Sequence, residues 1–210
     1  MIGVLVDLDG VLWFSQKLHK DAFIKAFKEF TGEAEELVNQ TWEFGESTHQ
    51  YASKLLSEIG IENQEVILKK FIAKKRMFAF QTDDIPLNTR LIETLTMLRN
   101  INLKIALVSS SSRLNVNKFI SVSKTKDLFD CIVDSSMVLS PKPSPDCYNY
   151  AMAKLELVPN RCIAIEDSDI GIQSARNANV KIVLKFAGIA EDSKFYISLN
   201  SSILKINHDH

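Results

Sequence analysis

The chain has 210 residues, of which 46% are hydrophobic and 24% are charged, and its formal net charge at pH 7 is -1. Such a composition is typical of a globular protein with an ample core, and the small net charge disfavours a general affinity for nucleic acid or anionic membranes. No apolar run approaches the roughly 20 residues of a membrane-spanning helix, and the N-terminus has no basic stretch typical of a secretory signal. We therefore expect a cytoplasmic protein whose partner is neither a membrane nor a nucleic acid.

The cysteines agree with that expectation. Cys131, Cys147 and Cys162 are odd in number, widely spaced and set in apolar segments. Disulfide frameworks and metal centres require closer or paired cysteines. We interpret all three as reduced residues of the core.

The first predicted element is a short buried strand at residues 2–6, which runs into the sequence Asp-Leu-Asp-Gly. From about residue 15 to 80, apolar side chains recur at helical spacing. One helix is predicted to end at Gly32, a second to run from Ser47 to the glycine at position 60, and a third to begin near Gln64. This block is predicted to be entirely helical.

After Pro86 the pattern alternates between helix and strand. Helices are predicted near 91–98, 113–122, 145–157 and 170–178, and strands at 103–108, 131–133, 161–165 and 180–184. Asn179 follows a predicted helix where a left-handed residue is common. Short, continuously apolar strands between helices indicate a parallel sheet with helices on both faces. No element is predicted after about residue 187.

These elements predict an α/β fold with two domains. The first is a Rossmann-like core formed by residues 1–14 and 82–210, in which helices cover both faces of a parallel sheet. The second is a small all-α cap domain, residues 15–81, inserted after the first strand. Pro86 and the acidic pair before it are the expected hinge back into the core.

Polar side chains follow the predicted strands at the edge of the sheet where ligands bind in open α/β folds. The residues at these strand ends are Asp7, Asp9, Ser109, Ser110, Ser111, Ser112, Glu166 and Asp167. Lys142 lies in the rigid sequence Ser-Pro-Lys-Pro-Ser-Pro before a predicted helix. Carboxylates suit a hard divalent cation, whereas hydroxyls, backbone N–H groups and a lysine suit phosphate.

Each of these motifs also has an ordinary structural explanation. An Asp-x-Asp after a strand is often a turn, consecutive serines often form a solvated loop, and Glu-Asp-Ser before a helix is a common N-terminal cap. A lysine between prolines is usually a surface residue. The appearance of all four motifs at successive strand ends favours a functional site.

The order of these motifs resembles the haloacid dehalogenase superfamily of aspartate-nucleophile phosphatases and phosphomutases. Within it, the chain is similar to the branch with a helical cap, which includes β-phosphoglucomutase-like and phosphoglycolate phosphatase-like proteins. The matching segments are residues 4–12, 105–111, 142–146 and 165–168, followed by Gly171 and Ile172. The resemblance implies a Mg²⁺-dependent enzyme that acts on a small phosphorylated metabolite, such as a sugar phosphate.

The resemblance also implies roles for individual residues. Asp7 would be the nucleophile that forms an aspartyl phosphate, and Asp9 would be the general acid and base. Ser109 and the backbone of Ser110 would bind the phosphoryl group. Lys142 would neutralise the charge of that group and of the nucleophile.

The metal site and the cap complete the implied machinery. Glu166 and Asp167 would hold Mg²⁺ together with the nucleophile and with the backbone carbonyl of Asp9. His19, at the cap entrance, stands where the β-phosphoglucomutase-like branch has a histidine, and it would bind substrate or relay a proton. A solvent-facing histidine at the start of a helix is an equally weighted alternative.

The cap sequence bears on the choice between phosphatase and phosphomutase. A sugar phosphomutase must hold a second phosphate, which calls for Arg or Lys on the cap loop. Residues 41–49 contain two glutamates and no basic residue, and Lys54 is the nearest lysine. The basic residues between Lys69 and Arg76 are more typical of a solvated helix face. We therefore favour a phosphatase and keep a β-phosphoglucomutase-like phosphomutase as the alternative.

Two further classes are weaker alternatives. A dehalogenase would not need the acidic pair Glu166 and Asp167. A non-catalytic phospho-aspartate switch also combines strand-end aspartates, a hydroxyl and a lysine, but its acceptor lies on the third strand and it has no large insertion. The third strand here is followed by Asp134 without the rest of that pattern. Nothing in the sequence requires an oligomer, and a monomer is compatible with it.

Overall fold

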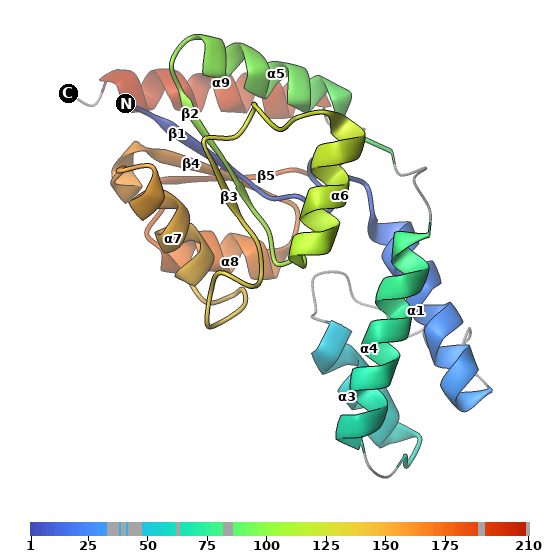
Figure 1. Ribbon diagram of the computed structural model, residues 1–210. Coiled ribbons are helices and arrows are strands. Elements are labelled where there is room, and N and C mark those ends of the chain that lie inside the picture. Colours follow the sequence, from blue (N-terminus) through green and yellow to red (C-terminus); the bar gives the residue numbers. More distant parts are fainter. Residues whose placement is uncertain are drawn as a thin grey trace. The chain divides into compact units, whose positions relative to one another are not determined.

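The computed structural model describes residues 1–32, 38, 41, 48–61, 64–81, 86–188 and 192–208. The chain divides into two compact units (Figure 1). The core unit comprises Met1–Phe14 and Pro86–His210, and the helical unit comprises Ser15–Ile85. The hinge acids before Pro86 and the N-cap expected at Ser47 lie outside the described residues.

A parallel sheet forms the centre of the core unit, as predicted. Within the described residues it contains five strands in the order β3-β2-β1-β4-β5. The strands are β1 (Gly3–Val6), β2 (Lys104–Val108), β3 (Cys131–Val133), β4 (Cys162–Glu166) and β5 (Ile182–Lys185). Val4 of β1 lies between Ile105 of β2 and Ile163 of β4, and all four residues of β1 are buried. The first strand in the sequence is therefore central in the sheet.

Helices cover both faces of this sheet, which explains why its strands lack apolar–polar alternation. The helices of the core unit are α5 (Thr89–Asn100), α6 (Arg113–Ser123), α7 (Asp146–Lys154), α8 (Asp169–Asn177) and α9 (Asp192–His208), with the short 3-10 helix η1 (Pro159–Arg161). Figure 1 shows α5 and α9 together on one face, and α7 and α8 on the other. The predicted fold class is confirmed.

One helix boundary and one whole helix depart from the predictions. The helix expected at 145–157 ends at Lys154, because the chain turns there through Glu156, which has a left-handed φ of 55°. Asn179 has a φ of 58°, as expected from its place after α8. Helix α9, by contrast, was not predicted.

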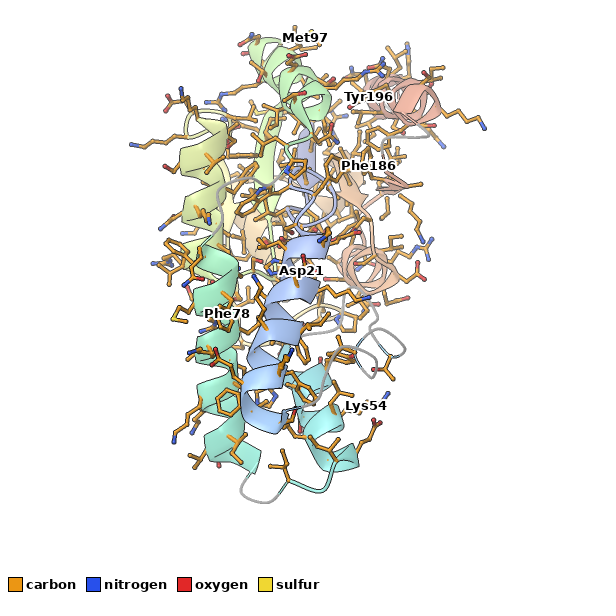
Figure 2. All side chains as sticks on the ribbon, turned by 90° about the vertical axis from the view of Figure 1, so that its right-hand side faces the viewer. Asp21, Lys54, Phe78, Met97, Phe186 and Tyr196 are labelled. Atoms are coloured by element: carbon orange, nitrogen blue, oxygen red, sulfur yellow. The ribbon has the colours of Figure 1, made fainter. Side chains whose placement is uncertain are left out.

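The apolar spacing of α9 is nevertheless visible in the sequence. Phe195, Leu199, Ile203 and Ile206 recur every three or four residues and are buried. Phe186, which directly follows β5, packs against α9, since the rings of Phe186 and Phe195 lie 5.1 Å apart; Figure 2 labels Phe186 and Tyr196. The serines and asparagine between these positions weaken the helical signal.

The helical unit is built around aromatic side chains. Its described helices are α1 (Gln16–Thr31), α3 (Thr48–Glu58) and α4 (Gln64–Phe80). Phe23 of α1 packs against Tyr51 of α3 and Phe71 of α4, with ring centroids 4.9 and 4.8 Å apart. Helix α1 ends at Gly32, which has a φ of 74°, as predicted. No helix among the described residues has both the length and the apolarity needed to cross a bilayer.

Candidate active site

The turn after β1 brings two aspartates to the carboxyl edge of the sheet. The backbone N–H of Asp7 donates to the Ile165 carbonyl of β4 at 3.0 Å, so Asp7 continues the line of the strand. The chain then reverses at Gly10, whose N–H donates to the Trp13 carbonyl at 2.8 Å. Gly10 has a φ of 83°, which residues with a Cβ rarely adopt. Asp7 is buried by this turn, and Asp9 is half-buried.

Lys142 connects the ends of three strands. Its Nζ donates to Oδ1 of Asp7 at 2.7 Å, to Oε1 of Glu166 at 2.5 Å and to the Val108 carbonyl at 3.0 Å. The lysine side chain is only 6% exposed. Burial alone would lower the pKa of Lys142, but the two facing carboxylates raise it well above its ordinary value. Lys142 is therefore a permanent cation in this site.

The loop that carries Lys142 is anchored to α8. The Ser174 hydroxyl donates to the Ser144 carbonyl at 2.5 Å, and the Asn177 side-chain amide donates to the Pro143 carbonyl at 2.9 Å. The prolines keep this loop out of regular secondary structure. The two side chains of α8 therefore supply the hydrogen bonds that these backbone carbonyls need. They hold the lysine loop against the helix that follows β4.

Three carboxylates meet beside the lysine. Asp7, Glu166 and Asp167 each offer an oxygen, and these oxygens all lie within 4.8 Å of one another. Oε2 of Glu166 is buried and accepts no hydrogen bond from the residues that the structure describes. A buried carboxylate oxygen without a donor is costly unless a cation binds it. The donor set, composed only of oxygens, fits Mg²⁺.

The backbone of α8 leaves room for this arrangement. Ser168 caps the helix by accepting from the Gly171 N–H at 3.1 Å. A Cβ atom at Gly171 would overlap the carboxylate of Glu166. The sequence Glu-Asp-Ser is thus both a helix cap and a source of two metal-binding candidates.

The pKa of Asp7 reflects its burial and the carboxylates that lie close to it. Burial raises the pKa of Asp7 well above its ordinary value, and the nearby Glu166 carboxylate adds to the rise, while Lys142 opposes it. Without a further positive charge nearby, Asp7 therefore resists ionisation. This is a second indication that the carboxylates are arranged around a cation.

The serines after β2 occupy distinct positions. Ser109 is buried, and its Oγ accepts from the Ser111 N–H at 2.9 Å. Ser110 is exposed at the same strand end, and Ser112 caps α6. The Ser111 hydroxyl donates to Oδ2 of Asp9 at 2.6 Å. Sequence reasoning assigned no role to Ser111, although it lies within the motif.

Tyr148 is a second residue that the sequence analysis missed. Its hydroxyl donates to Oε1 of Glu166 at 2.6 Å, and the Nζ of Lys142 lies 5.3 Å from the centre of its ring. Burial raises the pKa of Tyr148 well above its ordinary value, so the hydroxyl stays protonated as a donor. In the sequence, Tyr148 appears only as part of the apolar face of a helix.

His19 lies in the helical unit, whereas the other predicted site residues lie in the core unit. Its Nδ1 is 3.4 Å from the Nζ of Lys75, which also donates to the Thr48 hydroxyl at 3.0 Å. Lys75 is only 8% exposed. The expectation of a solvated basic face is therefore wrong for Lys75, although Lys69 and Arg76 are exposed. Helical periodicity turns Lys75 toward α1 and α3.

Comparison with known proteins agrees with this geometry. The family model described as haloacid dehalogenase-like hydrolase matches residues 4–185. The protein CbbY of Rhodobacter capsulatus is 26% identical over 200 residues, which cover 87% of this chain and 84% of CbbY. A phosphorylated carbohydrates phosphatase of Thermotoga maritima is 23% identical over 196 residues, which cover 92% of this chain and 89% of the phosphatase.

Solved structures show the same fold. β-Phosphoglucomutase of Clostridium difficile matches with a TM-score of 0.77 at 22% identity, and the match covers 98% of each chain. The resemblance inferred from the motifs at the strand ends is confirmed. Because the family model spans most of its length, the chain belongs to the haloacid dehalogenase-like hydrolases.

Proposed function

We propose that this protein is a Mg²⁺-dependent phosphatase that hydrolyses a small phosphorylated metabolite through an aspartyl phosphate on Asp7. The observation that supports this most directly is the position of Asp7, which bonds to a buried lysine and faces two further carboxylates at the carboxyl edge of the sheet. The names of the relatives point to phosphorylated carbohydrates as the substrate class. Membership of a hydrolase family disfavours the non-catalytic switch.

The proposed reaction proceeds in two displacements. A carboxylate oxygen of Asp7 attacks phosphorus, the bond to the leaving oxygen breaks, and Asp9 donates a proton to that oxygen. Asp9 then takes a proton from water as the water attacks phosphorus and the bond to Asp7 breaks. Inorganic phosphate leaves, and both aspartates return to their starting state. The hydrogen bond from Ser111 would hold Asp9 in place for both transfers.

Neutralisation of charge supports these steps. Uncatalysed hydrolysis of phosphate monoesters is among the slowest reactions in biology, so positioning and electrostatic stabilisation must supply most of the acceleration. Lys142 supplies a buried positive charge beside the nucleophile. Ser109 and the backbone N–H of Ser110 would bind oxygens of the transferring group.

The acidic cluster would hold the metal. Asp7, Glu166 and Asp167 would contribute carboxylate oxygens, and Asp9 its backbone carbonyl. When bound, Mg²⁺ supplies positive charge to the oxygens of the transferring phosphoryl group. The positive charge of Lys142 offsets the repulsion between the carboxylates of Asp7 and Glu166, because its Nζ donates to both.

Phosphate release from para-nitrophenyl phosphate and a panel of sugar phosphates, with and without Mg²⁺, tests the proposal. Asp7→Asn is expected to lower the rate at least about a thousandfold, because the nucleophile is lost. Asp21→Asn is the matched control, since Asp21 lies on the surface of α1 (Figure 2) and pairs there with Lys17. Release that persists in Asp7→Asn, or that needs no metal in the wild type, would refute this mechanism.

A phosphomutase is the second candidate, and one observation favours it. Lys75 places a buried amino group inside the helical unit, beside Thr48 and His19. A phosphomutase needs such a basic group for the second phosphate of a bisphosphate intermediate. Activation by a sugar bisphosphate, with isomerised sugar phosphate as product instead of free phosphate, would identify this activity.

A further inference from the structure

The carboxylate of Glu166 has two chemically different oxygens. Oε1 accepts two hydrogen bonds, from the Nζ of Lys142 at 2.5 Å and from the hydroxyl of Tyr148 at 2.6 Å. Oε2 accepts none from the described residues, although the Glu166 side chain is only 1% exposed. Both protein donors are therefore concentrated on one oxygen.

Tyr148 is built into the core in a way that fixes its hydroxyl. Its side chain is fully buried on α7, among residues of β2, β4 and α8. Phenol and carboxylate are both rigid and planar at their ends, so a single short hydrogen bond between them restricts how the carboxylate can rotate. The ring also lies beside the ammonium group of Lys142, which limits the positions that this second donor can take.

Gly171 restricts Glu166 from another direction. The position that a Cβ atom would occupy at Gly171 overlaps both oxygens of the carboxylate. Gly171 lies in the first turn of α8 and is not among the glycines with a positive φ. The backbone conformation at Gly171 therefore does not require glycine. The close approach of the Glu166 carboxylate is what requires it.

We propose that Tyr148 and Gly171 are positioning residues for Glu166, which together commit Oε2 to the metal ion. Tyr148 holds Oε1, and Gly171 admits the carboxylate close to α8. The inference rests on the proposed metal site formed by Asp7, Glu166 and Asp167. Partners of this kind, one step removed from the metal, typically change affinity by about 10- to 100-fold when they are removed.

The first test is Tyr148→Phe, which removes one oxygen atom and keeps the ring. Calorimetric titration of the metal-free protein with Mg²⁺ is expected to show a dissociation constant raised about tenfold. Phosphate release is expected to return to near the wild-type kcat at saturating Mg²⁺, because Lys142 and the nucleophile are unchanged. A purely structural role would instead lower the melting temperature and leave the dissociation constant unaltered.

Tyr150→Phe is the matched control. Tyr150 lies two residues later on α7, is half-buried and packs against the same hydrophobic cluster. The Tyr150→Phe variant is expected to bind Mg²⁺ with the same dissociation constant as the wild type. Equal dissociation constants for the wild type and Tyr148→Phe would overturn the inference while leaving the metal site intact. A wild type that does not bind Mg²⁺ would instead refute the proposed metal site itself.

Gly171→Ala tests the steric half of the inference without measuring activity. Alanine favours helix over glycine by about 1 kcal/mol, so a loss of stability must come from contact with Glu166. The substitution is expected to lower both the melting temperature and the affinity for Mg²⁺. In a Glu166→Ala background, the same change is expected to cost no stability, because the overlapping carboxylate is gone. A cost that is equal in both backgrounds would contradict a role in positioning Glu166.

Discussion

Both units of this protein bury a hydrophobic cluster, but the core unit also buries an ionic network at its strand ends. In the core unit, a buried lysine and buried carboxylates meet at the ends of parallel strands, and each contact depends on a particular atom. In the helical unit, Phe23, Phe27, Tyr51 and Phe71 pack ring against ring. Ionic networks of the first kind are strongly destabilised when one partner is lost, whereas aromatic cores depend mainly on volume.

From this difference we expect the reaction to depend on the strand ends of the core unit and the choice of substrate on the helical unit. The core unit cannot lose Lys142 without leaving the buried carboxylates of Asp7 and Glu166 without their shared cation. The helical unit can exchange apolar side chains of similar volume and still fold. We therefore expect substitutions in the helical unit to affect its own stability and the choice of substrate, and substitutions at the strand ends to affect the reaction itself.

Lys142→Met is expected to have one of the two largest effects, together with Phe71→Ala. It leaves the buried carboxylates of Asp7 and Glu166 without their shared cation, and breaking such a group typically costs about 3–5 kcal/mol. Urea denaturation without metal measures the loss, and Mg²⁺ is expected to restore part of it. Lys104→Met is the control, because Lys104 is 38% exposed in its ion pair with Asp130. An equal loss in the two variants would contradict the larger cost expected for removing a buried cation.

Phe71→Ala tests the aromatic core of the helical unit. Phe71 is fully buried and meets the rings of Phe23, Phe27 and Phe30, so its truncation is expected to cost about 3–5 kcal/mol. Amide hydrogen exchange should accelerate in α1, α3 and α4 and remain unchanged in β1 and β4.

The control for Phe71→Ala is Phe78→Ala on the same helix (Figure 2). Phe78 is only partly buried, and the Nζ of Lys74 lies 5.4 Å from its ring centre. Phe78→Ala is therefore expected to lower the free energy of unfolding less than Phe71→Ala does. Faster exchange in β1 after the loss of Phe71 would show that the two units unfold together.

Asp134→Asn is expected to have the smallest effect and to depend on pH. Burial would raise the pKa of Asp134, but hydrogen bonds from Ser136 and Arg113 outweigh it and lower the pKa. The stability that Asp134 contributes is therefore fully present above the unfolded pKa of about 3.9 and disappears as the pH falls through the lower folded pKa. At neutral pH the substitution should cost about 1–2 kcal/mol.

Denaturation of the wild type and Asp134→Asn at several pH values checks this prediction. The difference in unfolding free energy should shrink below about pH 4, as the wild-type carboxylate becomes protonated. A difference that stays constant down to strongly acidic pH would show that the charge of Asp134 contributes nothing to stability.

Much of the fold could be predicted because the sequence patterns that indicate its strands and helices involve neighbouring residues. Continuous apolar runs identified the strands, and helical spacing identified α1, α3 and α4. The convergence of Asp7, Lys142 and Glu166 followed from one rule, that parallel strands end at the same edge of a sheet. Helix α9 was missed although its apolar spacing is present, because residues with poor helix propensity separate its buried positions.

The sequence by itself determined which residue types stand at the strand ends, and with them the family. Only the tertiary structure decided which atoms meet. The position of β1 between β2 and β4 sets Asp7 beside Glu166, and the packing of α7 turns Tyr148 toward Oε1 of Glu166. Periodicity is a property of neighbouring residues, whereas a hydrogen bond between residues 18 positions apart depends on how helices pack against the sheet.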